Sequence, residues 1–171
     1  MFVDLSDRLP EEADLLGRRS HPPLDPVDRR LVELLVADGR LSVHELAARA
    51  GVARSTAYSR VDRLQADGVI TGFSATVDPA AVGLGITALV LVDVDQQRWH
   101  SARDAMLELP GVEYLAFTLG TFDMVLLVRA ADVDDLRTVV LERLHELDEV
   151  RSAQTVVVVE EHRRPVLPKS G

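Results

Sequence analysis

The sequence has no cysteine and no long apolar run, and each absence excludes a class of protein. Without cysteine the chain forms neither disulfides nor thiolate metal sites. The longest apolar run, Val82 to Val92, has eleven residues and includes glycine and threonine, so it is too short to cross a bilayer. The first residues lack the basic and apolar segments of a secretory signal peptide. We therefore expect a cytoplasmic protein with no membrane partner.

Signatures of catalysis are also missing. The sequence contains no nucleophile elbow, no phosphate-binding glycine loop and no evident acid/base pair. None of the histidines stands at metal-ligand spacing from another. They are His21, His44, His100, His145 and His162. We predict a protein that is not an enzyme and that needs neither a metal nor a cofactor.

Three short helices are predicted in the first half of the chain. Asp25 caps the first helix, and a proline follows at its first position. Ser42 and Glu45 form a capping box that begins the second helix. Gly51 makes the tight turn to the third helix, which runs from about Ala53 to Asp67. A short glycine-bounded strand at Gly68–Phe73 follows it, so the segment is predicted to be a winged helix-turn-helix, a fold that binds DNA.

The exposed face of the third helix carries the side chains that are predicted to contact double-stranded DNA. Small polar and aromatic groups near its start suit base edges in the major groove, and arginines suit phosphates. The base-edge candidates are Ser55, Tyr58 and Ser59, the phosphate candidates are Arg54, Arg60 and Arg63, and Thr56 lies beside them.

Two of these side chains have a second interpretation. Arg60 lies closer to the buried face of the helix and could instead pair with Glu33 or Glu45. Tyr58 could pack on the surface of its own domain. Asp62, on the same face, is interpreted as a solvated charge.

The acidic charge lies outside the predicted DNA-binding segment. The chain has a net charge of −9, with 28 acidic against 19 basic residues. From Leu24 to Gly72, 7 arginines balance 7 acidic residues, whereas from Phe73 onward 16 acidic residues face 9 basic ones. An acidic second domain would be repelled by DNA and leave the neutral segment to dock.

The second half of the chain is predicted to be a ferredoxin-like βαββαβ domain. Its apolar pattern alternates between strand and helix periods, and a turn at Gly120-Thr121 joins the middle strands as a hairpin. The predicted strands are 86–95, 112–119, 122–129 and 150–160, and the predicted helices are 99–109 and 132–147. The fold class is therefore α+β, with an N-terminal winged helix-turn-helix before this domain.

Several of the predicted strands are apolar on both faces. Leu89–Val92, Val125–Val128 and Val156–Val159 are apolar at odd and even positions alike. Two helices cover only one face of a four-stranded sheet, so the other face needs a partner. A second copy of the chain is the simplest partner, and a dimer suits a protein that binds two DNA half-sites.

Taken together, these patterns resemble the leucine-responsive/asparagine-regulator (Lrp/AsnC) family of transcription factors. The resemblance covers about Leu24 to His162. It depends on the helical segment from LDPVDRRLVELL to DGVITGF, on the order of elements, and on GTFD at Gly120–Asp123 followed by TVVVVEE. It implies dimers that often assemble into octamers, and a small effector, usually an amino acid, bound between ferredoxin-like domains.

The resemblance also implies where the effector binds. The site would include the hairpin turn and the residues opposite it: Leu119, Gly120, Thr121, Phe122, Asp123, Thr155 and Val156. Gly120 permits a backbone conformation with exposed N–H groups that suit a carboxylate, and Asp123 offers an anion for an ammonium group. The alternative is an ordinary hairpin turn. The sequence departs from the family at Thr121, where an acidic or amide residue is usual, and at Ala53, where serine usually caps the third helix.

These observations lead to a domain plan and to a function. We expect a mobile extension at 1–23, the DNA-binding domain at 24–72, a hinge at 73–85, the effector-binding and oligomerisation domain at 86–162, and a tail at 163–171. The predicted function is a homo-oligomeric transcriptional regulator that responds to a small metabolite. The alternatives are a nucleoid-type protein without effector and, on the same architecture, an enzyme similar to sirohaem decarboxylases.

Overall fold

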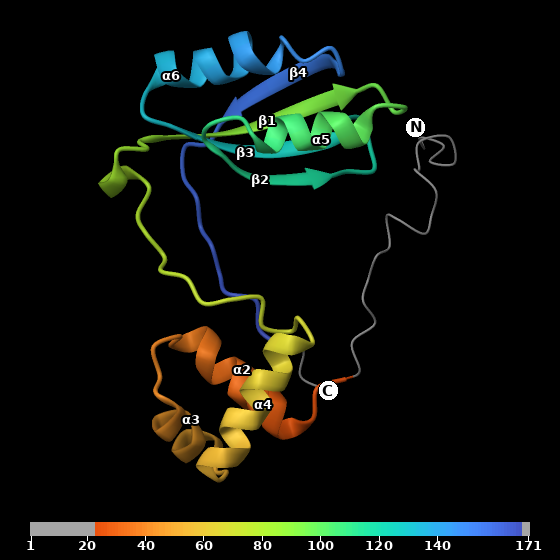
Figure 1. The fold of residues 1–171 in the computed structure, drawn as a ribbon. Helices are drawn as coiled ribbons and strands as arrows, with labels where there is room; N and C mark the ends of the chain where they lie inside the picture. The colour runs from red at the N-terminus through yellow and green to blue at the C-terminus, as the bar shows by residue number, and fades with distance from the viewer. Residues whose placement is uncertain (1–22, 169–171) are drawn as a thin grey trace. The chain divides into compact units, whose positions relative to one another are not determined.

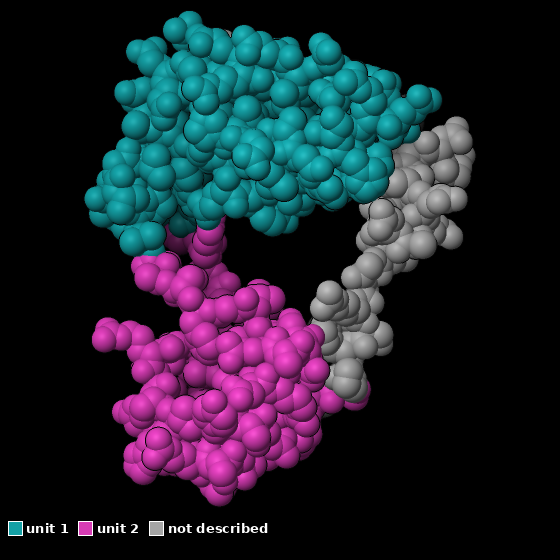
Figure 2. All heavy atoms as spheres, viewed as in Figure 1, with its two compact units in different colours: residues 1–17, 77–161 teal, residues 18–76, 162–171 magenta. Residues whose placement is uncertain are grey.

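The computed structural model describes residues 23–168, which group into two compact units. One unit contains Val77–Glu161, and the other contains the described residues up to Thr76 together with 162–168 (Figures 1 and 2). The chain therefore passes from one unit to the other twice. Of the predicted extension at 1–23, only Pro23 lies within the described residues. No helix in the described part of the chain is long and apolar enough to span a bilayer.

The helices of the first unit begin where the capping residues predict. Helix α2 (Pro26–Ala37) follows Asp25, whose carboxylate accepts a hydrogen bond from the Asp28 N–H at 2.8 Å. Helix α3 (Val43–Ala50) begins with the complete capping box of Ser42 and Glu45 and ends at Gly51, where φ is 70°. These local hydrogen bonds satisfy backbone groups that the ends of helices otherwise leave unpaired.

Helix α4 (Arg54–Ala66) completes the three-helix unit and packs against both α2 and α3. Its N-cap is Ala53, which has extended backbone but makes no capping hydrogen bond. Ala57 and Leu64 are its fully buried residues. The apolar core of the unit contains Leu31, Leu34, Leu46, Ala47 and Ala57.

The predicted strand of the wing is wrong. Residues 68–73 form no strand among the described residues. Instead, the Val69 and Ile70 N–H groups both donate to the Leu64 carbonyl oxygen, at 2.9 and 3.0 Å. These bonds close the end of α4, and a strand forms only where a second strand lies beside it to complete its ladder. The described unit is therefore a helix-turn-helix without a wing.

The second unit is the predicted βαββαβ domain. Its strands are β1 (Ile86–Val94), β2 (Val112–Phe117), β3 (Met124–Ala130) and β4 (Val150–Val157), all antiparallel in the order β2-β3-β1-β4. This arrangement confirms the predicted fold class, because each helix connects two strands that are not neighbours in the sheet (Figure 1).

Two helical segments pack against this sheet. They are α5 (Trp99–Leu107) and α6 (Val133–Arg137), and the latter continues as the π-helix η2 (Thr138–Leu144). The single helix predicted at 132–147 is therefore present, but its second half has wider turns. The residues that face these helices alternate along β1 and are fully buried: Ala88, Val90, Val92 and Val94.

The opposite face of the sheet is also apolar. Leu89 and Leu91 on β1 and Val125 on β3 are half-buried, and Leu127 is 9% exposed. Val156 pairs with Leu89 on the same face and is 44% exposed. The prediction that the strands are apolar on both faces is confirmed for β1 and β3, so the domain has an apolar surface on the side away from α5 and α6. For the last strand it is wrong in extent, because β4 ends at Val157, before Val158 and Val159.

Candidate DNA interface and effector site

The N-terminal half of α4 presents the polar surface that the sequence predicts. Arg54, Ser55 and Tyr58 are exposed, and Tyr58 retains 58% of its accessible surface. More than half of the residue is therefore open to solvent, and the alternative that it packs on the surface of its own domain stays open. Ser59 is exposed too, although its hydroxyl donates to the Thr56 carbonyl oxygen at 3.2 Å. Arg54, Ser55 and Tyr58 thus remain the side chains best placed to contact DNA.

Arg60 and Arg63 contact carboxylates within the same unit. Arg60 Nη1 lies 2.9 Å from Asp28 Oδ1 and also hydrogen-bonds Asp25 Oδ2. Arg63 Nη2 pairs with the other Asp28 oxygen, Oδ2. The hydrogen bond from Arg60 lowers the pKa of the Asp25 carboxyl, and the same carboxylate, with that of Asp28, raises the pKa of Arg60.

The predicted alternative for Arg60 was right about an ion pair but wrong about the partner. Glu33 instead lies 3.5 Å from Arg30, and Glu45 belongs to the capping box. Arg63 is only partly available for a phosphate contact. Its Nη2 is bound by Asp28, although its side chain stays 53% exposed. The buried Asp28 was missed, because a first-turn aspartate is most often only a favourable charge at a helix N-terminus.

The hairpin between β2 and β3 is closed by its own hydrogen bonds. The Thr118 N–H donates to the Asp123 carbonyl oxygen at 2.9 Å, and the Thr118 hydroxyl donates to the Phe122 carbonyl oxygen. Gly120 does not have a positive φ, and a Cβ added there would meet nothing within 4 Å. Gly120 therefore does not use the left-handed conformation that glycine permits, and residues 118–123 reverse the chain without a left-handed residue.

The Asp123 carboxylate is partly occupied by the backbone. Its Oδ2 accepts a hydrogen bond from the Val94 N–H at 3.0 Å, and the Asp123 N–H donates to the Val92 carbonyl oxygen at 3.0 Å. These bonds join the hairpin to the end of β1, where the pairing with β4 changes register. Asp123 therefore has a structural role, which leaves Oδ1 for any ligand.

Within one chain, Thr155 and Val156 do not adjoin the hairpin turn. They pair with Val90 and Leu89 on β1, whereas the hairpin joins the sheet at the Met124–Val92 pair. Strand β1 lies between β3 and β4, and three residues along a strand span about 10 Å. Because consecutive residues of a strand point to opposite faces, the side chains of Thr155 and Val156 lie on different faces of the sheet.

One further polar cluster lies on the apolar face of the sheet and was not predicted. Arg129 on β3 is 7% exposed, with Nε 2.6 Å from Glu113 and Nη2 2.9 Å from Glu161. Its Nη1 also donates to the Thr87 hydroxyl. Burial works to lower the pKa of Arg129, but the hydrogen bonds to both glutamates outweigh it and raise the pKa. The sequence offered one sign of this cluster, namely an arginine at the end of an otherwise apolar strand.

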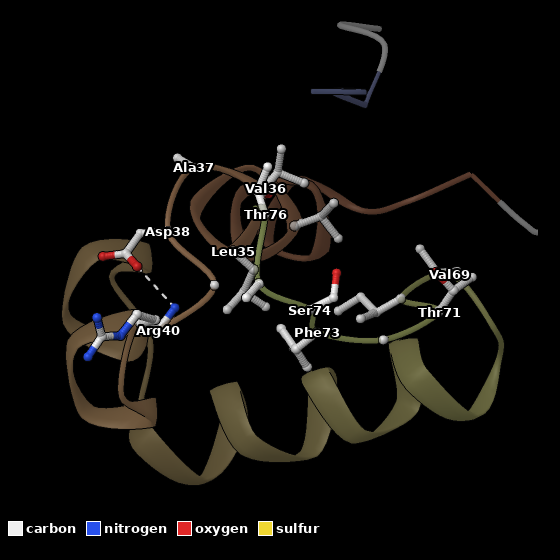
Figure 3. Close-up of a pocket in the computed structure, with 15 residues that line it drawn as sticks. Leu35, Val36, Ala37, Asp38, Arg40, Val69, Thr71, Phe73, Ser74 and Thr76 are labelled. Carbon is white, nitrogen blue, oxygen red and sulfur yellow. Dashed lines mark hydrogen bonds between the residues drawn. The ribbon is translucent and has the colours of Figure 1, made fainter. Parts of the chain in front are cut away.

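A groove of about 830 Å³ lies within the helix-turn-helix unit rather than at the predicted effector site. It is lined by the second half of α2, the α2–α3 turn and residues 69–76 (Figure 3). Phe73 faces it and is 51% exposed. Among the described residues no group of three or more histidine, aspartate or glutamate side chains could hold a metal ion.

Comparison with known proteins assigns both units to one family. Residues 24–65 match the AsnC-type helix-turn-helix domain, and residues 87–166 match the Lrp/AsnC ligand binding domain. The HTH-type transcriptional regulator AldR of Mycolicibacterium smegmatis is 38% identical over 148 residues, covering 85% of this chain and 86% of the relative. The HTH-type transcriptional regulator LrpA of Mycobacterium tuberculosis is 38% identical over 136 residues, covering 79% and 90%.

A solved structure supports the same assignment. The feast or famine regulatory protein of Mycobacterium tuberculosis, complexed with L-methionine, superposes with a TM-score of 0.76 at 35% identity, covering 82% of this chain and 95% of that one. The relatives are named as transcriptional regulators, which confirms the prediction of a regulator rather than an enzyme. The chain is a DNA-binding transcriptional regulator and belongs to the Lrp/AsnC family.

Proposed function

We propose that this regulator binds DNA sequence-specifically through the start of α4. The proposal is carried by one observation: Arg54, Ser55 and Tyr58 are exposed together on the helix that follows the tight turn at Gly51. A hydroxyl discriminates bases less sharply than a bidentate side chain, so part of the specificity would come from DNA shape. Arg54 would contact a phosphate, where it adds affinity but no sequence preference.

In vitro selection of DNA from a random pool tests base recognition. Tyr58→Ala should change the selected motif, whereas Gln65→Ala, an exposed change near the end of α4, should leave it unchanged. Identical motifs from both variants would refute base recognition by Tyr58.

The salt dependence of binding tests the phosphate contact. Arg54→Ala should reduce the salt slope by about one unit on every sequence, because one phosphate contact is lost. Arg143→Ala, on the exposed side of η2 in the other unit, is the matched control. Equal slopes for the two variants would remove Arg54 from the interface.

We also propose that the regulator is a homodimer joined through the second face of the sheet. The apolar side chains of that face support this, because burying them against a second copy gains about 25 cal/mol per Å² of apolar surface. Leu91→Glu should produce monomers in sedimentation experiments. Val159→Glu is the control: it also replaces an apolar residue with glutamate, but Val159 is 99% exposed, so this variant should remain dimeric. A monomeric unaltered protein at micromolar concentration would disprove the dimer.

The proposed effector is an amino acid or a related metabolite, bound by Leu119–Asp123 together with Thr155 and Val156. A relative that is 35% identical is complexed with L-methionine, which supports this class of ligand. Since β1 separates the two groups of residues within one chain, the site would combine residues of different copies. The assembly of dimers into octamers that the family resemblance implies would bring such copies together.

Asp123→Asn tests the effector site without removing the structural hydrogen bond. The asparagine oxygen can still accept from the Val94 N–H, but the negative charge that would hold an ammonium group is lost. A thermal-shift screen with L-methionine and the other amino acids should show stabilisation of the unaltered chain and of Asp148→Asn, a control on an exposed loop, but not of Asp123→Asn. If no amino acid or keto acid stabilises the unaltered chain and footprints show uniform coating of DNA, the nucleoid-type alternative is favoured.

A further inference from the structure

The ion cluster between α2 and α4 joins Arg60 and Arg63, in the middle and the second half of α4, to the start of α2. Asp28 uses both carboxylate oxygens, one for Arg60 at 2.9 Å and one for Arg63. Asp25 adds a second contact to Arg60. The Asp28 side chain is 6% exposed, so this carboxylate is withdrawn from water and depends on the two guanidinium groups for its hydrogen bonds.

Helix α4 also packs against α3 and α2 through Ala57, Val61 and Leu64, but its N-terminus is weakly held. Its N-cap Ala53 makes no side-chain capping hydrogen bond, and no acidic residue lies in its first turn. Charge-assisted hydrogen bonds from a buried carboxylate to two side chains one turn apart restrict rotation of the helix about its axis more than a small apolar contact does. The position of the base-contacting side chains of α4 therefore depends on Asp28 as well as on the apolar packing of the helix.

The same contacts restrain the charge of α4. Arg60 and Arg63 lie next to the predicted DNA-contacting face, and free arginines there would bind any phosphate whatever the sequence. The carboxylates of Asp25 and Asp28 compete for these cations and offset their charge. Because the helix-turn-helix segment is neutral, two released arginines would be a large change in its local field.

We propose that Asp28 is a positioning residue that determines specificity: it holds Arg60 and Arg63 on α2, orients α4, and withholds two cations from sequence-independent phosphate contacts. The inference rests on the proposed recognition of DNA by α4. It goes further because it proposes that Asp28, a buried carboxylate that does not itself contact DNA, determines the ratio of specific to non-specific affinity.

The test measures binding of the full chain to two duplexes by fluorescence anisotropy across a salt series. One duplex is the sequence enriched by in vitro selection with the unaltered protein, and the other has random sequence. Asp28→Asn should strengthen binding to the random duplex and steepen its salt slope by about one unit, since it releases Arg63, which adds about one phosphate contact, and leaves Arg60 only its hydrogen bond to Asp25. The ratio of affinities for the selected and random duplexes should fall on the order of tenfold.

Asp67→Asn is the matched control. Asp67 is an exposed carboxylate directly after α4, outside the predicted DNA-contacting face, and has no ion pair in the described part of the chain, so its replacement makes the same change in net charge without releasing an arginine. Its random-duplex slope should match that of the unaltered chain. Equal slopes for Asp28→Asn and Asp67→Asn would overturn the proposal. Equal weakening on both duplexes by Asp28→Asn would also overturn it, because that result indicates a stabilising role alone.

Two further variants keep the test decisive if Asp28→Asn does not fold. Asp25→Asn retains a good N-cap residue for α2 and loosens only Arg60, so it should steepen the random-duplex slope by about one unit or less. In a chain that carries Arg60→Gln and Arg63→Gln, Asp25→Asn should leave the slope unchanged. The proposal is contradicted if Asp25→Asn changes the salt slope of the chain that lacks both arginines, or if it leaves the slope of the otherwise unaltered chain unchanged. If the unaltered chain binds neither duplex, the proposed function fails rather than this inference.

Discussion

Replacing Ala53 by serine should stabilise the helix-turn-helix unit. The backbone at Ala53 has φ −65° and ψ 149°, the extended conformation that an N-cap residue adopts, and only the side-chain hydrogen bond is missing. A serine oxygen there can accept from the N–H of Ser55 or Thr56, two of the donors that the start of α4 leaves without an intrahelical partner. A serine cap in place of alanine is worth about 1 kcal/mol, within a range of roughly 0.5–2 kcal/mol.

Calorimetry of the full chain measures this gain. A stabilisation of about 1 kcal/mol raises the melting temperature of a small domain by roughly 4–8 °C. Trp99, the only tryptophan, lies in the other unit, so the transition followed by its fluorescence should not move. Ala48→Ser is the control, because the same substitution at an exposed position inside α3 should lower stability by about 0.5 kcal/mol. If Ala53→Ser gives no increase, or Ala48→Ser gives an equal one, the capping argument is wrong.

Two further predictions concern the sheet unit. The hydrogen bond from the Ser101 hydroxyl, at 2.8 Å, is the largest cause of the lowered pKa of Glu149. As the pH falls, the Glu149 carboxylate is protonated in the unfolded chain before it is protonated in the folded chain. Its contribution to stability is therefore complete above the ordinary glutamate pKa of 4.5 and is lost as the pH falls through the lower pKa of the folded protein. Glu149→Gln should therefore flatten the acid side of a stability profile followed by Trp99 fluorescence; an unchanged acid midpoint would contradict this. Gly111→Ala should destabilise the unit by more than ~2 kcal/mol in urea titrations, since φ is 79° and an added Cβ would lie 2.2 Å from the Arg129 carbonyl oxygen. A loss below ~1 kcal/mol would show that this loop relaxes freely.

The elements that the sequence predicted correctly depend on interactions between near neighbours or on a repeating period. Asp25 and its following proline, the Ser42–Glu45 box and Gly51 act over three or four residues, so their caps form wherever the segment is placed. The apolar period likewise indicated the strands and their order along the chain, and apolar residues at odd and even positions alike indicated the second apolar face.

The elements that the sequence did not predict depend on contacts between distant residues. Arg60 and Arg63 reach Asp25 and Asp28 across more than thirty positions, and no local rule distinguishes those carboxylates from Glu33 or Glu45. The predicted strand at 68–73 was wrong for the same reason, because a strand needs a neighbouring strand and the described unit does not contain one. At the hairpin, Asp123 contacts a backbone group twenty-nine positions earlier. Local pattern thus determined which helices and strands form, whereas only the tertiary structure decided which charges are paired, because a charged side chain binds whichever opposite charge the fold brings within reach.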